Sequence, residues 1–338
     1  MMFRQLFDHE SFTYTYLLAQ VPGSEALLID PVLGKVDHYI RLLEELQLKL
    51  VKVLDTHVHA DHITAAAELR DRTQCITIMG EESNVDSVSQ RICDGEIISI
   101  EGLSLTALYT PGHTDDSYCF LMKDRVFTGD TLLIRGTGRT DFQSGRADLA
   151  YESITRKLLT LPDDILVYPG HDYKGDSIST IGEERSHNPR LQVADKAAYV
   201  ELMNNLNLDD PKMMDVAVPA NQKVAMAQQE IDDLGWSYSS DKLRHLLADE
   251  KVLLVDLRED SEREKKGYIE SSINVPYNNI DVAIAKNGVL NELAHATSKE
   301  LVFYCAYGER SAMALKAARA VGLECFHLKG GMAAWAHN

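Results

Sequence analysis

A cluster of polar side chains at residues 56–62 limits the possible folds more than any other part of this chain. The cluster reads Thr-His-Val-His-Ala-Asp-His, and three histidines with a carboxylate in so short a stretch are typical of metal binding. It follows an apolar run at residues 50–54, which we expect to form a buried strand, and precedes a helix-forming stretch at residues 63–70. The pattern predicts a polar site where a strand passes into a helix.

The ligand-type side chains of this cluster do not all point in the same direction. His57 and His59 are two residues apart on extended chain, so their side chains lie on the same side. Asp61 and His62 come after the bend and must face elsewhere. The cluster can therefore serve two adjacent subsites.

Three further candidate ligands each follow an apolar run that reads as a strand. They are His113 in Tyr-Thr-Pro-Gly-His, Asp130 in Thr-Gly-Asp, and His171 in Tyr-Pro-Gly-His-Asp. A single histidine after a strand is usually an ordinary loop residue. Four strand ends that each deliver histidine or aspartate instead indicate a metal centre.

In this order, the motifs His-x-His-x-Asp-His, Pro-Gly-His, Gly-Asp and Gly-His resemble the metallo-β-lactamase superfamily over about the first half of the chain. The resemblance implies an αββα sandwich, in which two sheets pack together between outer helices. The alternation of short strand-like runs with helix-like stretches suits this architecture.

A glycine-rich basic loop follows Asp130 and reads Arg-Gly-Thr-Gly-Arg-Thr-Asp-Phe-Gln at residues 135–143. Its arginines could be solvated surface residues, but the position of Arg139 beside a candidate ligand favours the binding of an anionic substrate. Gly-Arg-Thr-Asp-Phe-Gln, with the His-Asp-Tyr-Lys-Gly motif that begins at His171 and the segment at residues 183–190, resembles the glutathione persulfide dioxygenases.

This second resemblance implies an iron enzyme with one Fe(II) in its first domain, and zinc is an alternative metal. The residues that match the family's iron ligands are His57, His113 and Asp130. Those expected to orient the ligands, to shuttle protons or to hold a second metal are His59, Asp61, His62 and His171. Those expected to bind glutathione are Arg139 and Tyr173.

The composition changes after about residue 220, and we expect a second domain beyond that point. The predicted boundaries are residues 1–220 for the first domain, 221–238 for a polar linker and 239–338 for the second domain. In the second domain, apolar runs at residues 252–255 and 301–304 alternate with helix-like stretches. Such alternation predicts a doubly wound parallel sheet.

Cys305 is the second candidate reactive group. It stands between the strand-like run at residues 301–304 and an alanine-rich helix expected at residues 311–320. Successive backbone N–H groups in this loop, together with the helix N-terminus, can hold an anion and favour the nucleophilic thiolate. Arg310 adds a positive charge. A cysteine after an apolar strand is more often an inert core residue, but the loop and the arginine favour a catalytic role.

The motifs Asp-Leu-Arg-Glu, Cys-x-x-Gly-x-Arg-Ser and Gly-Gly-Met-x-x-Trp occur in the order that resembles the rhodanese domain. The resemblance implies that Cys305 carries sulfane sulfur as a persulfide, with Arg310 completing the loop. The other loop residues are Ala306, Tyr307, Gly308 and Glu309. Because Glu309 brings a negative charge to the loop, the sulfur donor stays open.

Charge and cysteine content narrow the partners and the compartment. The formal net charge of −18 argues against nucleic acid and against an anionic membrane surface. The chain shows no signal-peptide pattern and no apolar run long enough to cross a membrane. Five scattered cysteines suit a reducing compartment, so we expect a cytoplasmic protein. Relatives of the dioxygenase domain suggest a homodimer.

The resulting hypothesis is oxidation of glutathione persulfide by O2 to sulfite and glutathione. This reaction would be coupled to sulfane-sulfur transfer through Cys305, with thiosulfate or persulfide as partners, in sulfide detoxification. One alternative is a binuclear zinc thioesterase of the glyoxalase II type, although the added helical domain of those enzymes has no counterpart here. Another is a sulfur carrier without catalytic activity.

Overall fold

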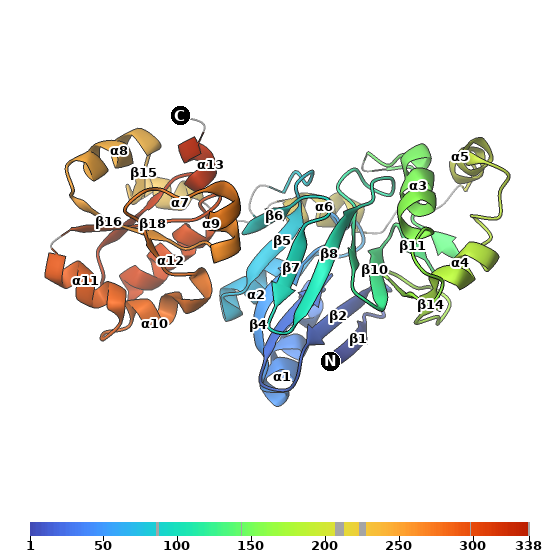
Figure 1. Cartoon of the computed structure of the whole chain (residues 1–338), viewed down its shortest axis with the longest axis horizontal. Coiled ribbons are helices and arrows are strands. Elements are labelled where there is room, and N and C mark those ends of the chain that lie inside the picture. Colours follow the sequence, from blue (N-terminus) through green and yellow to red (C-terminus); the bar gives the residue numbers. More distant parts are fainter. Residues whose placement is uncertain (86–87, 143, 207–212, 223–227, 298, 337–338) are drawn as a thin grey trace. The chain divides into compact units, whose positions relative to one another are not determined.

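The computed structural model describes residues 1–85, 88–142, 144–206, 213–222, 228–297 and 299–336 (Figure 1). Contacts between Cα atoms divide the chain into two compact units. The first unit is Met1–Asp86 with Arg91–Val224, and the second is Ser87–Gln90 with Ala225–Asn338. Within the described residues, no helix is long and apolar enough to cross a membrane.

The first unit is built on two sheets. The strand order of one sheet is β1 (Met2–Phe7), β2 (Tyr14–Ala19), β3 (Glu25–Ile29), β4 (Lys49–Leu54), β5 (Ile76–Gly80) and β6 (Gln90–Ile92). The order of the other is β14 (Ser179–Thr180), β13 (Leu166–Pro169), β10 (Arg125–Gly129), β9 (Tyr118–Leu121), β8 (Leu103–Tyr109) and β7 (Ile97–Ile100). A short ribbon pairs β11 (Leu132–Leu133) with β12 (Gly136–Thr137).

Alternate side chains of each strand serve the two faces of these sheets. Tyr16 of β2 contacts Phe127 of β10, with ring centroids 4.9 Å apart, so the two sheets pack face to face. Its neighbour Leu17 belongs instead to the core beneath the helices. The helical segments of this unit are η1 (Leu33–Lys35), α1 (Val36–Glu45), α2 (Ala66–Thr73), α3 (Ala147–Ser153), η2 (Ile154–Leu158), α4 (Ile181–His187), α5 (Lys196–Asn204) and α6 (Met214–Gln222).

Helices cover the outer face of each sheet. Val36, Tyr39 and Leu43 of α1 pack with the core residues of the first sheet. Ile154 of η2 and Ile181 of α4 pack with those of the second sheet. The first unit is therefore the expected αββα sandwich.

The helix after the histidine cluster begins later than predicted, at Ala66 rather than at residue 63. Thr64 is engaged in other bonds: its hydroxyl donates to Asp55 and accepts from the N–H of Ala66, and its backbone forms a bridge with Val32. These bonds hold residues 63–65 in the polar loop, so the helix cannot include them.

The second unit contains a parallel sheet with the order β15 (Ser237–Tyr238), β19 (Cys325–Leu328), β18 (Glu300–Tyr304), β16 (Val252–Asp256) and β17 (Ile273–Asn274). Alternating β18 residues face opposite sides, and Val302 and Tyr304 pack in a cluster with Leu243 of α8 and Trp335 of α13. Contacts of α12 with β18 and β19 complete a doubly wound domain. The helical segments are α7 (Gln228–Asp233), α8 (Ser240–Ala248), α9 (Asp260–Lys266), η3 (Tyr277–Asn279), α10 (Ile280–Ile284), α11 (Val289–Thr297), α12 (Glu309–Ala320) and α13 (Gly331–Ala336).

The stretch expected to be a linker, residues 221–238, contains regular structure where it is described. It includes α7, and its last two residues form β15, which pairs with β19. Residues 223–227 of that stretch lie outside the described residues. A strand of two residues is too short to show the alternation by which strands are predicted, so no pattern indicated it.

Candidate metal centre and sulfur-transfer loop

The loop after β4 is fixed by Asp30, a buried residue that follows β3. Its carboxylate accepts hydrogen bonds from the backbone N–H of Thr56 (2.7 Å), from the Thr56 hydroxyl (2.9 Å) and from Nε2–H of His59 (3.2 Å). Because the Thr56 hydroxyl proton is given to Asp30, its oxygen accepts from Nδ1–H of His57 (2.9 Å). His57 therefore keeps the Nε2 lone pair free for a metal ion.

A hydrogen bond through Nδ1 also fixes the ring of His113, and its acceptor comes from another part of the chain. Its Nδ1–H donates to the carbonyl of Arg139 (2.7 Å), which leaves Nε2 free. That Nε2 lies 3.7 Å from Oδ2 of Asp130. The preceding Gly112 has φ +146°, and a Cβ atom there would lie 2.3 Å from Cα of Ala150. The Pro-Gly-His turn thus requires glycine to deliver the imidazole.

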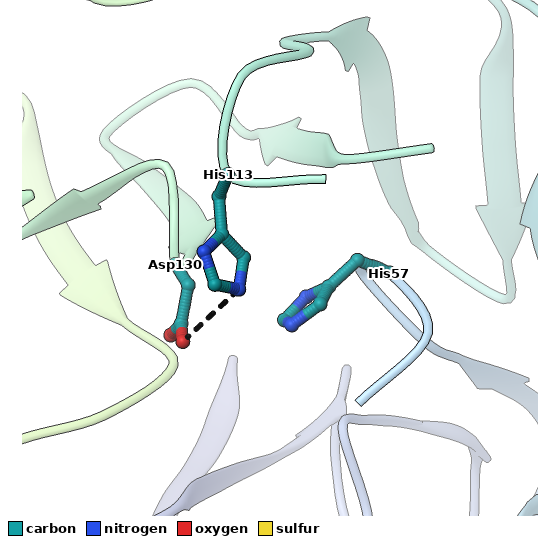
Figure 2. A group of neighbouring side chains, drawn as sticks. All are labelled: His57, His113 and Asp130. Atoms are coloured by element: carbon teal, nitrogen blue, oxygen red, sulfur yellow. Dashed lines mark ion pairs between the residues drawn. The ribbon is translucent and has the colours of Figure 1, made fainter. Parts of the chain in front are cut away.

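The structure brings His57, His113 and Asp130 together, with ligand atoms within 4.8 Å of one another (Figure 2). Burial and the neighbouring histidines hold the pKa of His57 well below its ordinary value. Burial would raise the pKa of Asp130, but the charge and the hydrogen bond of His171 lower it. Two free imidazole nitrogens and an ionised carboxylate form a set that suits an octahedral metal with open positions.

His171 lies between two carboxylates and is not a free ligand in this arrangement. Its Nδ1–H donates to Asp130 Oδ1 (2.7 Å), and its Nε2–H donates to Asp61 Oδ2 (2.8 Å). Although burial opposes the charge, these two carboxylates raise the pKa of His171 well above its ordinary value. His171 is thus an imidazolium that orients Asp130.

His59, Asp61 and His62 form a second group whose ligand atoms lie within 4.8 Å of one another. Nδ1 of His59 and Nε2 of His62 are buried and have no hydrogen-bond partner in the part of the chain that the structure describes. Asp61 Oδ2, however, already accepts from His62 Nδ1 (2.9 Å) and from His171. A second metal ion would have to displace these protons. The group can therefore serve in either role that the sequence left open, as hydrogen-bonding partners of the ligands or as ligands of a second metal.

A cavity of about 690 Å³ opens beside His113, Asp130 and His171. Both predicted glutathione-binding residues line it. Arg139 donates two hydrogen bonds of 2.7 Å to Asp141, so its charge is already paired, whereas the Tyr173 ring is 65% exposed and stacks on His171.

Sequence reasoning missed two residues of this site. Arg190 also lines the cavity, and its guanidinium donates to the carbonyl and hydroxyl of Thr137. No carboxylate pairs with Arg190 among the residues that the structure describes. Asn221 of α6 donates to the carbonyls of His59 and His62, both at 2.9 Å. Both residues lie in segments that resemble the persulfide dioxygenases, Asn-Pro-Arg at residues 188–190 and Val-Ala-Val-Pro-Ala-Asn at residues 216–221, but neither segment indicated a role in the site.

In the second unit, Cys305 follows β18 and is buried. The backbone N–H of Gly308 donates to its sulfur at 3.1 Å. The last helix, α13, also contacts this loop, since the N–H groups of Met332 and Ala333 donate to the carbonyls of Cys305 and Ala306 at 2.8 and 3.0 Å.

Arg310 is paired with a carboxylate, and its positive charge also interacts with the Cys305 sulfur. Its two terminal nitrogens donate to the carboxylate of Glu262, each at 2.7 Å, so that a buried ion pair joins α12 to α9. Glu309 is also buried, while Ala306 and Tyr307 are half-buried. Among the described residues, the Cys305 sulfur accepts a hydrogen bond from the Gly308 N–H and donates one to the Ser311 hydroxyl.

Residues 10–171 match the family model of the metallo-beta-lactamase superfamily, and residues 239–338 match that of the rhodanese-like domain. Mitochondrial persulfide dioxygenase ETHE1 of Mus musculus is 43% identical over 225 residues, which cover 66% of this chain and 88% of that protein.

Two crystal structures are similar to the chain. That of ETHE1 from Myxococcus xanthus is 51% identical with a TM-score of 0.64, over 66% of this chain and 98% of its own. That of a metallo-beta-lactamase from Staphylococcus aureus is 22% identical with a TM-score of 0.62, over 98% of both chains. The second likeness concerns the fold alone, and it extends over both units.

Proposed function

Because this chain belongs to the persulfide dioxygenase family of the metallo-β-lactamase superfamily and carries a rhodanese-like domain, we propose that it oxidises glutathione persulfide. One persulfide, one O2 and one water would give one glutathione, one sulfite and two protons. The observation that carries this proposal is the grouping of His57, His113 and Asp130, with both Nε2 atoms free. Two histidines and one carboxylate are the ligand set of iron oxygenases.

The chemistry of the donors fits Fe(II), although histidine and aspartate also accept zinc. Bound by these three residues, iron would supply open positions for the persulfide sulfur and for O2 and the electron transfer that their reaction needs. The Arg139 carbonyl fixes the ring of His113, and the His171 imidazolium fixes the carboxylate of Asp130. Such partners orient ligands and adjust their basicity.

The remaining cavity residues would bind and orient glutathione. Glutathione carries two carboxylates, and the cavity wall contains Arg139, Lys174 and Arg190. Arg190 lacks a carboxylate partner among the described residues, so a substrate carboxylate can pair with it directly. Asp61 and His171 share a proton at the same wall, where a product thiolate or an incoming persulfide can exchange one.

For the second unit we propose transfer of sulfane sulfur through Cys305. The Cys305 thiolate would attack the outer sulfur of glutathione persulfide; a new S–S bond forms, the donor's S–S bond breaks, and glutathione leaves as its thiolate. Sulfite would then attack the outer sulfur of the Cys305 persulfide, releasing thiosulfate and restoring the thiolate. The sulfite made by the first unit would thus be consumed by the second, a sequence suited to sulfide detoxification.

The dioxygenase proposal is tested by O2 uptake of the iron-loaded protein with glutathione persulfide. Uptake should fall at least about a hundredfold in His113→Ala, because one of three ligands is lost. His38→Ala removes an exposed histidine of α1 and should leave uptake unchanged. Equal uptake by the His113→Ala and parent proteins would contradict the assignment.

The thioesterase alternative is favoured by one observation, the second donor group of His59, Asp61 and His62. It requires two metal ions per chain and hydrolysis of a glutathione thioester without O2. Metal analysis and a thioester assay on zinc-loaded protein distinguish it from the dioxygenase. A sulfur carrier would show neither reaction and no stoichiometric metal.

Coupling of the two sites is tested by thiosulfate formed from persulfide and O2, corrected for the reaction without enzyme. Cys305→Ser should convert this product into sulfite, whereas Cys93→Ser should not. Unchanged thiosulfate in Cys305→Ser would end the coupling proposal.

The homodimer and the cytoplasmic location stay predictions. Light scattering measures the first, and cell fractionation measures the second.

A further inference from the structure

Behind Cys305, a chain of buried hydrogen bonds leads away from the sulfur. The Cys305 sulfur lies 3.8 Å from the Ser311 hydroxyl, which lies 3.2 Å from Nδ1 of His327. Nε2 of His327 lies 3.0 Å from the hydroxyl of Ser237, its register partner on β15. Ser311 and His327 are both fully buried. The motif of the cysteine loop did not include His327.

The Ser311 hydroxyl has one proton, which fixes the direction of these bonds. It donates to the carbonyl of Gly308 at 3.0 Å, and a carbonyl can only accept. The Ser311 oxygen therefore accepts from Nδ1–H of His327, a ring that also hydrogen-bonds to the Gly308 backbone. Nε2 of His327 is then the ring nitrogen without a proton, 3.0 Å from the Ser237 hydroxyl. In this state the Cys305 thiol donates to the same Ser311 oxygen.

Loss of the Cys305 proton changes which acceptor the Ser311 proton prefers. The sulfur becomes an anion, and charge-assisted hydrogen bonds are stronger than neutral ones. The proton can then turn from the Gly308 carbonyl to the sulfur. It cannot go to His327, because Nδ1 of that ring already carries a proton. The sulfur would then have two donors, the Ser311 hydroxyl and the Gly308 N–H.

His327 keeps a single ring proton over the working range of pH. Burial lowers the pKa of His327 to about 4, with the negative charge of Asp232 opposing and the positive charge of Lys329 assisting. Asp232 belongs to α7 and Lys329 follows β19, and the two form an ion pair with each other. The groups that face the ring from α12 and β15 are the neutral hydroxyls of Ser311 and Ser237.

We propose that His327 is a positioning residue of the sulfur-transfer site, which acts through Ser311 to keep a hydroxyl proton available to the Cys305 sulfur. The inference rests on the proposed sulfur transfer for its biological meaning. In physical terms, the Ser311 hydroxyl proton stabilises the Cys305 thiolate, and His327 keeps that proton from turning toward its own ring.

Two amide substitutions separate this role from simple core packing. The amide of His327→Asn lies near the position of Nδ1 and can still donate to Ser311. The amide of His327→Gln lies near the position of Nε2, so it reaches Ser237 but not Ser311. Both variants bury an amide in place of the imidazole, so a purely structural role would affect them alike. Ser311→Ala removes the hydroxyl itself.

The readout is the rate at which iodoacetamide alkylates Cys305, followed by peptide mass spectrometry from pH 5 to 10. We expect His327→Gln and Ser311→Ala to lower the rate at pH 7 about tenfold and to move the midpoint of the pH profile up by about one unit. His327→Asn should stay within about threefold of the parent protein. The double variant Ser311→Ala with His327→Gln should be no slower than Ser311→Ala alone, because the effects share one path.

The inference is overturned if folded His327→Gln reacts like the parent protein, if His327→Asn and His327→Gln are equally slow, or if the double variant shows multiplied effects. Should the variants not fold, 15N NMR of the parent protein decides: a neutral ring with its proton on Nδ1 supports the inference, and one with its proton on Nε2 overturns it. Normal alkylation behaviour without sulfur transfer would instead overturn the proposed function.

Discussion

At the scale of single residues, the chemistry of the first unit depends on which atom of each histidine is already engaged. Thr56 and the Arg139 carbonyl each take one ring N–H, so His57 and His113 are left with a free Nε2. The sequence could place these histidines at strand ends, because the apolar runs before them are plain. It could not assign the free nitrogen, because the acceptors come from other parts of the chain.

Protons held by His59 and His171 should make the stability of the metal-free protein depend on pH. Burial opposes the charge of His59, but Asp30 raises its pKa to about 9, and the pKa of His171 is also raised. An unfolded histidine titrates at about pH 6.5. Because the native state binds these protons more tightly, their stabilisation is complete below about pH 6.5 and is lost as the pH rises toward about 9.

We therefore expect the free energy of unfolding of metal-free protein to fall by roughly 1–3 kcal/mol between pH 6.5 and 9. Calorimetry measures this free energy. The unfolding transition of the first unit is identified as the one whose midpoint temperature rises when metal is added. His59→Gln cannot hold the proton and should show a flatter profile. A free energy of unfolding that rises over this range would contradict the assignment of charge.

Arg139 and Arg190 should differ in their importance for substrate binding. Arg139 was expected to grip glutathione, but it is paired with Asp141, only two residues away. Arg190 donates to backbone and hydroxyl oxygens of Thr137 and pairs with no carboxylate among the described residues, so it can also donate to a substrate carboxylate. We expect Arg190→Ala to raise KM for glutathione persulfide about tenfold and Arg139→Ala to raise it less. The reverse order in steady-state kinetics would show that Asp141 releases Arg139 to the substrate.

At the scale of helices and strands, the sequence predicted the elements with long apolar runs. The run at residues 50–54 lies within β4, and that at residues 301–304 lies within β18. Predictions failed where contacts distant in sequence decide the conformation. The start of α2 is set by the bonds of Thr64, and β15 exists because β19 offers it an edge.

Helix α6 should stabilise the metal loop through Asn221. Its amide bonds to the carbonyls of His59 and His62 and to the N–H of Thr64, each at 2.9 Å, across more than 150 residues of sequence. Asn221→Ala would leave these buried groups unpaired, which costs about 1–3 kcal/mol for each unsatisfied group. We expect lower thermal stability and about tenfold weaker iron binding, measured by chelator competition. Asp215→Ala, at an exposed position of the same helix, is the control, and equal effects of the two changes would contradict the role of Asn221.

At the scale of the whole molecule, one chain carries candidate sites for the two proposed sulfur reactions. The first unit provides a metal-ligand set beside a cavity with cationic side chains, and the second provides a cysteine at the end of a parallel strand. Both architectures were predictable, because ordered motifs lay at strand ends in each half. The second donor group and the relay behind Cys305 were not, because their partners meet only in the folded chain.

Persulfide oxidation by the first unit is measured through the stoichiometry of the reaction in Cys305→Ser, where Cys305 cannot transfer sulfur to the sulfite. Iron-loaded protein would be given glutathione persulfide in an oxygen electrode, and persulfide, sulfite and glutathione would be measured together. We expect one O2 to be consumed, and one sulfite and one glutathione to be formed, for each persulfide. Loss of persulfide without O2 uptake, or no turnover unless zinc and a thioester replace iron and persulfide, would contradict it.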